Sequence, residues 1–333
     1  MRLPLSPFPR LETRWRVALL CLYLVVVLPA LLFFNVGLTP DALVFVFLGA
    51  ALLVGRPALF VRDWGVFLLV VVLWQQTGPV ASMVNLPLHR GDLIATDQAI
   101  AWPLLHGALP QVWLQQHLFH KGHWQWYDLV SWAVYALHFP EPLIVGFAIW
   151  LRTRVGFQRF SLAFLTLAAI AFVGYIVYPA VPPWLAFRRY HAIPPVHKIF
   201  SLFNDDVLLG QLGHHYQHVL NVNYNLTAAM PSLHAAFPVL SALYLRKTFG
   251  RWGLLMLVYA AMMWFAVVYM AEHWTIDVIV GIGCALAAYA IVEGMASLLG
   301  RRAARRERVS TESANATRTE AISALSQRAG PGR

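Results

Sequence analysis

The chain has 333 residues, of which 59% are hydrophobic and only 12% are charged. Soluble domains carry about 25% charged residues, so this composition excludes an ordinary soluble protein and predicts an integral membrane protein. The formal net charge is +10, which in a membrane protein reflects basic cytoplasmic loops rather than a nucleic-acid partner. The cysteines, Cys21 and Cys284, both lie in apolar runs and exclude a disulfide framework.

The first predicted membrane helix covers residues 17–34 and follows a basic N-terminal stretch. Its apolar run exceeds the about 7–15 residues of a signal-peptide core, so we expect it to be retained. Further apolar runs approach the about 20 residues that cross a bilayer. They lie near residues 41–60, 64–80, 126–150, 159–178, 231–247, 252–271 and 275–299. The predicted fold is an all-α polytopic transmembrane bundle of about eight spans, with about six as the alternative because charged residues interrupt the second and third runs.

Basic clusters between the predicted spans indicate the topology. With a cytoplasmic N-terminus, every tight cluster falls on the cytoplasmic side, as the positive-inside rule requires. The clusters are Arg56 and Arg62; Arg152, Arg154 and Arg159; Arg246, Lys247 and Arg251; and Arg301, Arg302, Arg305 and Arg306. We therefore expect both termini in the cytoplasm, the protein in the plasma membrane, and long extracytoplasmic loops over residues 81–125 and 179–230. The first loop mixes Trp, His and Leu, which predicts short amphipathic helices in the membrane interface.

Ionisable side chains lie near the extracytoplasmic ends of two predicted spans. They are His234, His273 and Asp277. Such groups are costly at membrane depth and are functional hypotheses by default. His273 and Asp277 are four residues apart, so on a helix they share one face. The carboxylate could then fix the tautomer of His273 and leave its other nitrogen as a nucleophile, while His234 protonates a leaving group. The alternative is that each is an isolated interfacial residue.

Two motifs resemble the paired signature of the phosphatidic acid phosphatase type 2 superfamily. They are Pro231-Ser232-Leu233-His234 and His273-Trp274-Thr275-Ile276-Asp277. PSLH in place of PSGH is similar to the inositol phosphorylceramide synthase branch. The stretches AVPPW (Ala180–Trp184) and YALHFP (Tyr135–Pro140) also resemble that branch. The resemblance covers roughly residues 90–295.

This resemblance implies a role for each matching residue. His273 would be the nucleophile that forms a phospho-histidine, and Asp277 would orient it. His234 would act first as general acid and then as general base. Ser232 would bind a phosphate oxygen. The resemblance implies neither a metal nor a cofactor.

The sequence departs from the phosphatase branch in its basic residues. That branch has an early Lys and Arg-Pro motif, which is not found here, and a Ser-Arg pair where this chain has Ala266 and Val267. A phosphoryl group in transfer needs positive charge or several donors around its oxygens. Arg188 and Arg189, just after PPW, are the preferred phosphate-binding candidates. His138 is a further candidate, unless the nearby prolines simply break that helix.

The predicted organisation has three parts: transmembrane helices over residues 1–80, a catalytic membrane domain over 81–299 and a disordered basic tail over 300–333. The predicted activity moves a phospholipid headgroup phosphate, such as inositol phosphate, to a lipid or glycan alcohol without a metal. Its partners are therefore the phospholipid, the alcohol acceptor and membrane lipids. One alternative is a lipid phosphate phosphatase with water as acceptor. Another is a non-enzymatic membrane transporter or scaffold.

Overall fold

All the named secondary-structure elements of the described residues are helices, which confirms the all-α prediction. The computed structural model describes residues 18–19, 22–27, 40–53, 55–75, 86–138, 140–207 and 227–328. Much of the predicted span 17–34 and much of the second loop lie outside these residues. The chain divides into two compact units, residues 1–289 and residues 290–333, and the first unit contains the elements that build the site.

An aromatic core joins four helices of the first unit. They are α2 (Pro40–Leu53), α3 (Pro57–Gln75), α8 (Pro140–Arg152) and α9 (Arg154–Val177). Trp64 of α3 is fully buried and stacks on Phe157 of α9, with ring centroids 4.5 Å apart. Asp63, which interrupts the predicted third span, accepts two hydrogen bonds of 2.5 Å from Arg154. The ion pair of Asp63 with Arg154 therefore links α3 to α9.

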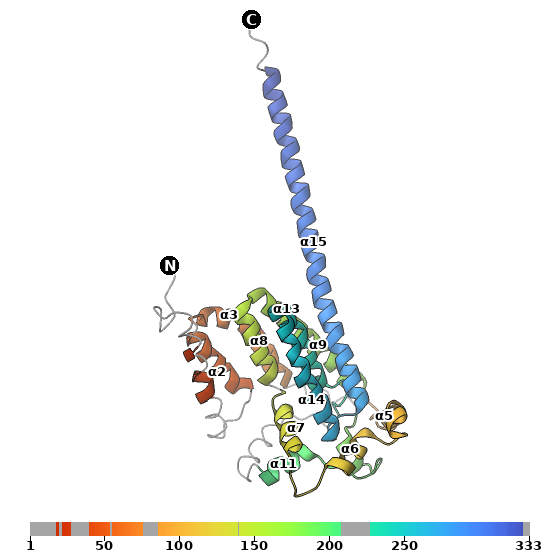
Figure 1. The fold of residues 1–333 in the computed structure, drawn as a ribbon. Helices are drawn as coiled ribbons and strands as arrows, with labels where there is room; N and C mark the ends of the chain where they lie inside the picture. The colour runs from red at the N-terminus through yellow and green to blue at the C-terminus, as the bar shows by residue number, and fades with distance from the viewer. Residues whose placement is uncertain are drawn as a thin grey trace. The chain divides into compact units, whose positions relative to one another are not determined.

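A helical hairpin sets the position of the two histidine motifs. It consists of α13 (Leu233–Phe249), the short 3₁₀ helix η1 (Gly250–Leu255) and α14 (Met256–Tyr269). Gly250 has φ of +66°, a conformation that favours glycine, and α13 and α14 pack side by side (Figure 1). The hairpin therefore brings the first residues of α13 to the end of α14, where α15 (Thr275–Arg328) begins after a short loop.

The membrane-spanning candidates are fewer than the sequence predicts. Within the described residues, three stretches are long and apolar enough to span, and a bent pair would make a fourth. They are Arg154–Val177, Leu233–Tyr269, Thr275–Arg308 and the pair Trp126–Ala136 with Pro140–Arg152. These apolar helices are those of an integral membrane protein, but the predicted number of about eight spans is not confirmed.

One predicted span and the predicted disordered tail differ in the structure. The predicted span 126–150 is broken into α7 (Trp126–Ala136) and α8, because Pro140 at the start of α8 cannot continue a helix from before it. In the second unit, α15 stays helical to Arg328, although composition predicts a disordered tail after residue 300. Ala, Arg and Glu are frequent there, and all three are good helix formers.

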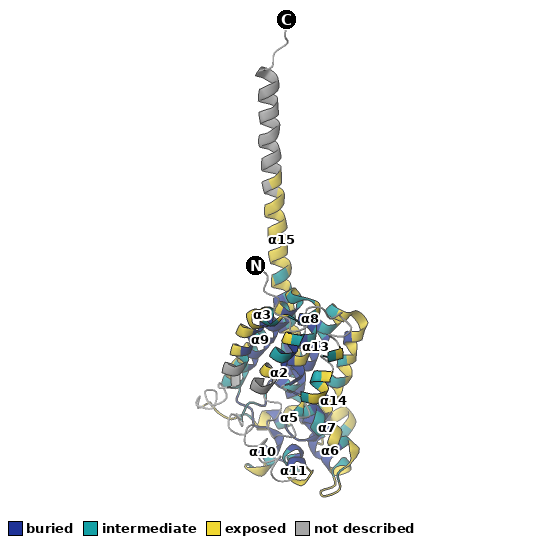
Figure 2. Cartoon of the chain, turned by 90° about the vertical axis from the view of Figure 1, so that its left-hand side faces the viewer, coloured by how far each residue is buried: buried dark blue, intermediate teal, exposed yellow. Residues whose placement is uncertain are grey.

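The predicted first extracytoplasmic loop is largely helical. It contains α5 (Gly91–Leu105) and α6 (Pro110–Leu118), and the second loop contains α10 (Pro183–Arg188) and α11 (Ile199–Val207). Figure 2 shows exposed residues along several of these short helices, and Trp102 of α5 is 65% exposed. A buried cluster joins α5 and α10 to Ala271 and Trp274, so these loop helices support the segment that carries His273.

Candidate active site

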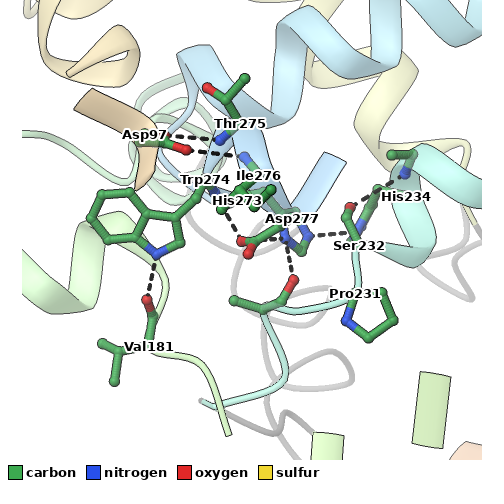
Figure 3. A network of polar contacts seen from close by, with 12 residues as sticks. Asp97, Val181, Pro231, Ser232, His234, His273, Trp274, Thr275, Ile276 and Asp277 are labelled. Carbon is green, nitrogen blue, oxygen red and sulfur yellow. Dashed lines mark hydrogen bonds and ion pairs between the residues drawn. The ribbon is translucent and has the colours of Figure 1, made fainter. Parts of the chain in front are cut away.

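The structure places His234 directly beside His273. Nδ1 of His234 lies 3.2 Å from Nε2 of His273 (Figure 3). His234 is in the first turn of α13, and His273 is in the loop between α14 and α15. The hairpin thus brings together two residues that are 39 positions apart in the sequence. Both ring nitrogens at this contact can reach one phosphoryl group, which is the geometry that acid–base and nucleophilic roles on one substrate require.

The direction of the His273 ring is set at its other nitrogen. Nδ1 of His273 lies 2.8 Å from the carbonyl oxygen of Ala229 and 3.5 Å from Oδ2 of Asp277. A carbonyl oxygen only accepts, so Nδ1 carries the hydrogen and Nε2 keeps its lone pair toward His234. The carboxylate predicted to orient His273 is therefore its more distant partner, and the backbone of Ala229 is the nearer one.

Asp277 holds the loop as well as facing the histidine. Its side chain is fully buried, and Oδ2 accepts a hydrogen bond of 2.9 Å from the backbone N–H of Trp274. The i,i+4 spacing predicted a shared helical face, but α15 begins only at Thr275, so His273 precedes the helix. Asp277 reaches back across the helix start, which is the return arm of a capping box.

Ser232 lies at the contact between α13 and α15. It is the N-cap residue of α13, and its Oγ accepts a hydrogen bond of 3.3 Å from the N–H of Ala235. Its own N–H donates to the carbonyl oxygen of Asp277 at 3.1 Å. A Cβ on Gly281 would stand 2.3 Å from the carbonyl oxygen of Ser232. Only glycine at 281 therefore allows α15 to pass this close to the PSLH motif.

His234 is flanked by rings from the end of α7. The centroid of its ring is 4.4 Å from that of Tyr135 and 3.8 Å from that of His138, and both pairs are stacked. Two rings this close and nearly parallel cannot share one face of an imidazole, so they lie on opposite faces. The predicted phosphate-binding candidate His138 is thus a buried neighbour of the His234 ring. Tyr135, which entered the sequence analysis only as part of the YALHFP stretch, also contacts His234 directly.

The AVPPW stretch forms the support behind the His273 loop. The indole N–H of Trp274 donates to the carbonyl oxygen of Val181 at 2.7 Å, and the backbone N–H of Trp184 donates to that of Ala271 at 3.1 Å. Ala229, whose carbonyl faces His273, donates its own N–H to the carbonyl of Ala180. This stretch therefore fixes both the loop that carries His273 and the carbonyl group that orients it.

The predicted arginines lie at the surface. Arg188 and Arg189 are exposed at the end of α10, and within the described residues neither contacts the histidine pair. The guanidinium of Arg189 lies 5.7 Å from the ring centroid of Tyr190, and that of Arg90 lies 4.5 Å from the same centroid. Arg90 carries no signal of this contact in the sequence, because 99 positions separate it from Arg189.

Comparison with known protein families identifies the superfamily to which this site belongs. A family profile described as the PAP2 superfamily matches residues 98–291, which is more than half of the chain and includes both histidine motifs. The chain belongs to the PAP2 superfamily. The resemblance predicted from the motifs is confirmed, including its branch, by the relatives described next.

Three curated relatives are synthases of inositol-containing sphingolipids by name. The chain is 31% identical over 192 residues to the phosphoinositol dihydroceramide synthase of Bacteroides thetaiotaomicron, covering 55% of this chain and 62% of that protein. It is 25% identical over 165 residues to the inositol phosphorylceramide synthase of Candida albicans, covering 46% and 33%. It is 22% identical over 172 residues to the inositol phosphorylceramide synthase catalytic subunit aur1 of Schizosaccharomyces pombe, covering 50% and 40%. The chain therefore spans less than two thirds of the length of each. No solved structure matches it significantly.

Proposed function

We propose that the protein is a membrane phosphotransferase that moves inositol phosphate from a phosphatidylinositol-type donor to the hydroxyl group of a ceramide-type lipid. The observation that carries this proposal is the His234–His273 contact of 3.2 Å, with Nδ1 of His273 held by Ala229 and Asp277. The relatives support the choice of headgroup and acceptor. A glycan alcohol is the other class of acceptor to test beside ceramide.

In the first step, the lone pair on Nε2 of His273 attacks phosphorus and the bond from phosphorus to the diacylglycerol oxygen breaks. The departing oxygen takes a proton from His234, which is thereby left neutral. The His273 ring gains positive charge as the bond to phosphorus forms. The carboxylate of Asp277, 3.5 Å from Nδ1, and the Ala229 carbonyl stabilise that charge.

In the second step, His234 removes the proton from the acceptor hydroxyl group. The acceptor oxygen attacks phosphorus, the bond from phosphorus to Nε2 breaks, and His273 recovers its lone pair. His234 regains the proton that it gave away, so the cycle closes without any other reagent. Ser232, whose Oγ uses a lone pair as the N-cap acceptor, still has its hydroxyl hydrogen for a phosphate oxygen.

Positive charge for the anionic headgroup comes from the surface arginines in this proposal. Arg90 and Arg189 share the ring of Tyr190, and among the described residues neither forms an ion pair with a carboxylate. Tyr190 packs on the same buried cluster as Trp274, next to His273. We therefore assign Arg189, together with Arg90, to capture of the donor headgroup, with Arg188 beside them. His138 acts through His234 rather than on the phosphate.

The active site faces the extracytoplasmic side of the plasma membrane in this proposal, with both termini in the cytoplasm. The basic clusters on the opposite side of the predicted spans support this orientation. Attaching an accessibility label at exposed Gln98 or at the C-terminus of intact cells would test it. Labelling at the C-terminus without permeabilisation would contradict it.

The direct test uses the full chain in lipid nanodiscs with phosphatidylinositol that is radiolabelled in the inositol ring. We expect a labelled inositol-phosphoryl lipid when dihydroceramide is present. Release of water-soluble inositol phosphate alone would instead establish hydrolysis and would overturn the transferase proposal. His273→Ala is the matched inactive control.

The arginine assignment has its own test in the same assay. Arg90→Gln and Arg189→Gln should each raise the KM for phosphatidylinositol about fivefold and leave kcat near wild type, because lost substrate binding appears in KM. Arg152→Gln, an exposed arginine far along the chain from this cluster, should change neither constant. Unchanged KM values in the first two variants would remove the arginines from the site.

A further inference from the structure

The N-cap position of α15 holds a residue whose side chain cannot accept a hydrogen bond. The N–H groups in the first turn of any helix have no partner within the helix and need outside acceptors. Ser, Thr, Asp or Asn at the N-cap position usually provides one. In α15 that position holds Trp274, whose indole donates to Val181 and has no acceptor to offer. Part of the HWTID motif therefore depends on another element.

Asp97 of α5 supplies the missing acceptors from 178 positions earlier in the chain. Its Oδ2 accepts from the N–H of Thr275 at 2.9 Å, and its Oδ1 accepts from the N–H of Ile276 at 3.0 Å (Figure 3). Asp277 meanwhile accepts from the N–H of Trp274. Two carboxylates thus satisfy the first three amides at the start of α15.

The burial of Asp97 indicates a demanding role. Its side chain is fully buried, and burying a carboxylate is costly unless hydrogen bonds compensate. A second carboxylate, Asp277, lies on the same helix start, which adds repulsion. The two amide hydrogen bonds and the positive end of the helix dipole offset this cost. An apolar side chain here would leave the Thr275 and Ile276 amides without acceptors.

We propose that Asp97 is a positioning residue for the phosphoryl transfer, because it fixes the first turn of α15 and so sets where His273 and Asp277 stand. This inference rests on the proposed function for its kinetic consequence. His273 directly precedes the helix start that Asp97 holds. Displacement of a reacting group by about 1 Å can lower a rate about 10²-fold, so the fixed helix start matters for the rate and not only for the fold.

The test uses three variants of the full chain in nanodiscs. Asp97→Ala removes both acceptors, Asp97→Asn keeps one carbonyl acceptor, and Gln98→Ala alters the exposed neighbour on α5 as a control. Turnover is measured well below the melting temperature of each variant. We expect kcat to fall about 10- to 100-fold in Asp97→Ala and by a smaller factor in Asp97→Asn, with KM within about threefold of wild type. Gln98→Ala should match wild type.

Two readouts do not depend on which acceptor the enzyme uses. Hydrogen exchange followed by mass spectrometry should show lost protection in the peptide that contains Thr275 and Ile276 in Asp97→Ala. The rate of carbethoxylation at His273 by diethyl pyrocarbonate should also change. Unchanged exchange and carbethoxylation, or a kcat within about twofold of wild type in folded Asp97→Ala, would overturn the inference. If the wild-type protein transfers no headgroup, the proposed function is wrong. Hydrogen exchange and carbethoxylation would still decide whether Asp97 holds the His273 loop.

Discussion

His273 stands in a loop where hydrogen bonds fix nearly every residue, whereas His234 stands on a helix and is held mainly by rings. Around His273, the groups of Ala229, Asp277, Val181 and Asp97 form a continuous polar network. Around His234, Tyr135 and His138 stack on the two faces of the imidazole. Within the described part of the chain, the His234 ring has one hydrogen bond, which its Nδ1 donates to Nε2 of His273.

The difference corresponds to what each proposed role demands. A nucleophile needs a lone pair that points in one direction, and a hydrogen bond to the opposite nitrogen provides this. A group that gives and then takes back a proton must let its nitrogens meet the substrate oxygens. Stacking holds such a ring in its plane and leaves its edge available. If the two sides of the site differ in this way, substitutions on each side should lower activity by different factors.

The largest effect is expected at the nucleophile. His273→Ala should lower transfer by at least about 10⁴-fold, because no other group on the hydrogen-bonded side can form the bond to phosphorus. The measurement is turnover of labelled phosphatidylinositol, with size-exclusion chromatography as the check on folding. Activity above about 1% of wild type in a folded variant would place the nucleophile elsewhere.

A smaller loss is expected when the more distant orienting group is changed. In triads where one carboxylate alone orients the histidine, its conversion to the amide lowers kcat about 10⁴-fold. Here the Ala229 carbonyl also accepts from Nδ1, so the tautomer survives and Asp277→Asn should lower kcat only about 10²-fold. A loss as large as in His273→Ala would show that Asp277 is the main orienting partner.

The stacking around His234 is tested by replacing each flanking ring with an aliphatic side chain. Tyr135→Leu should lower kcat about tenfold, because the acid–base group loses one of its two flanking rings. Tyr135→Phe keeps the ring and should stay within about threefold of wild type. His138→Phe and His138→Leu form the same matched pair on the other face. Equal losses in Phe and Leu variants would assign these residues a polar role instead of a stacking role.

The smallest effect concerns pH and belongs to the hydrogen-bonded side. Burial raises the pKa of Asp97 from its ordinary value of 3.8 to about 6, against the opposing effect of the Thr275 and Ile276 amides, and the nearby Asp277 adds to the rise. A raised pKa means that the folded protein holds the proton more tightly, so this stabilisation is complete below about pH 4 and is lost as the pH rises through about 6.

Thermal unfolding in detergent between about pH 4 and 7 measures this contribution. As the pH rises, the free energy of unfolding of the wild type should fall more steeply than that of Asp97→Asn, which has no titrating group at this position. The difference in slope should be at most about 1 kcal/mol per pH unit. Parallel curves for the two proteins would contradict the raised pKa of Asp97.

Much of the site could be predicted from local patterns. The apolar runs predicted helices, and polar residues at their ends drew attention to His234, His273 and Asp277. What could not be predicted depends on contacts between distant segments. The carbonyl of Ala229 leaves no mark in the sequence, and the rings of Tyr135 and His138 reach His234 only because α7 ends beside α13. Asp97 had one indirect signal, since HWTID places Trp274 where a capping residue is expected.

The number of spans was harder to predict than the site. Hydropathy counts apolar length, but it does not show where a proline breaks a helix. The break before Pro140 divides the predicted span 126–150 without changing its apolar residues. Hydropathy also fails after residue 300. Low hydrophobicity predicts disorder there, but the frequent good helix formers allow α15 to continue.

The shortness of α14 has a consequence for the surrounding bilayer. The helix has 14 residues and rises about 21 Å, against a hydrocarbon thickness of about 30 Å. Hydrophobic mismatch of this size favours local thinning of the bilayer. Thinning beside α14 would lower the lipid headgroups toward the loop that carries His273, so donor and acceptor could react without leaving the membrane. The acyl-chain length of the host lipids then becomes a determinant of turnover in its own right.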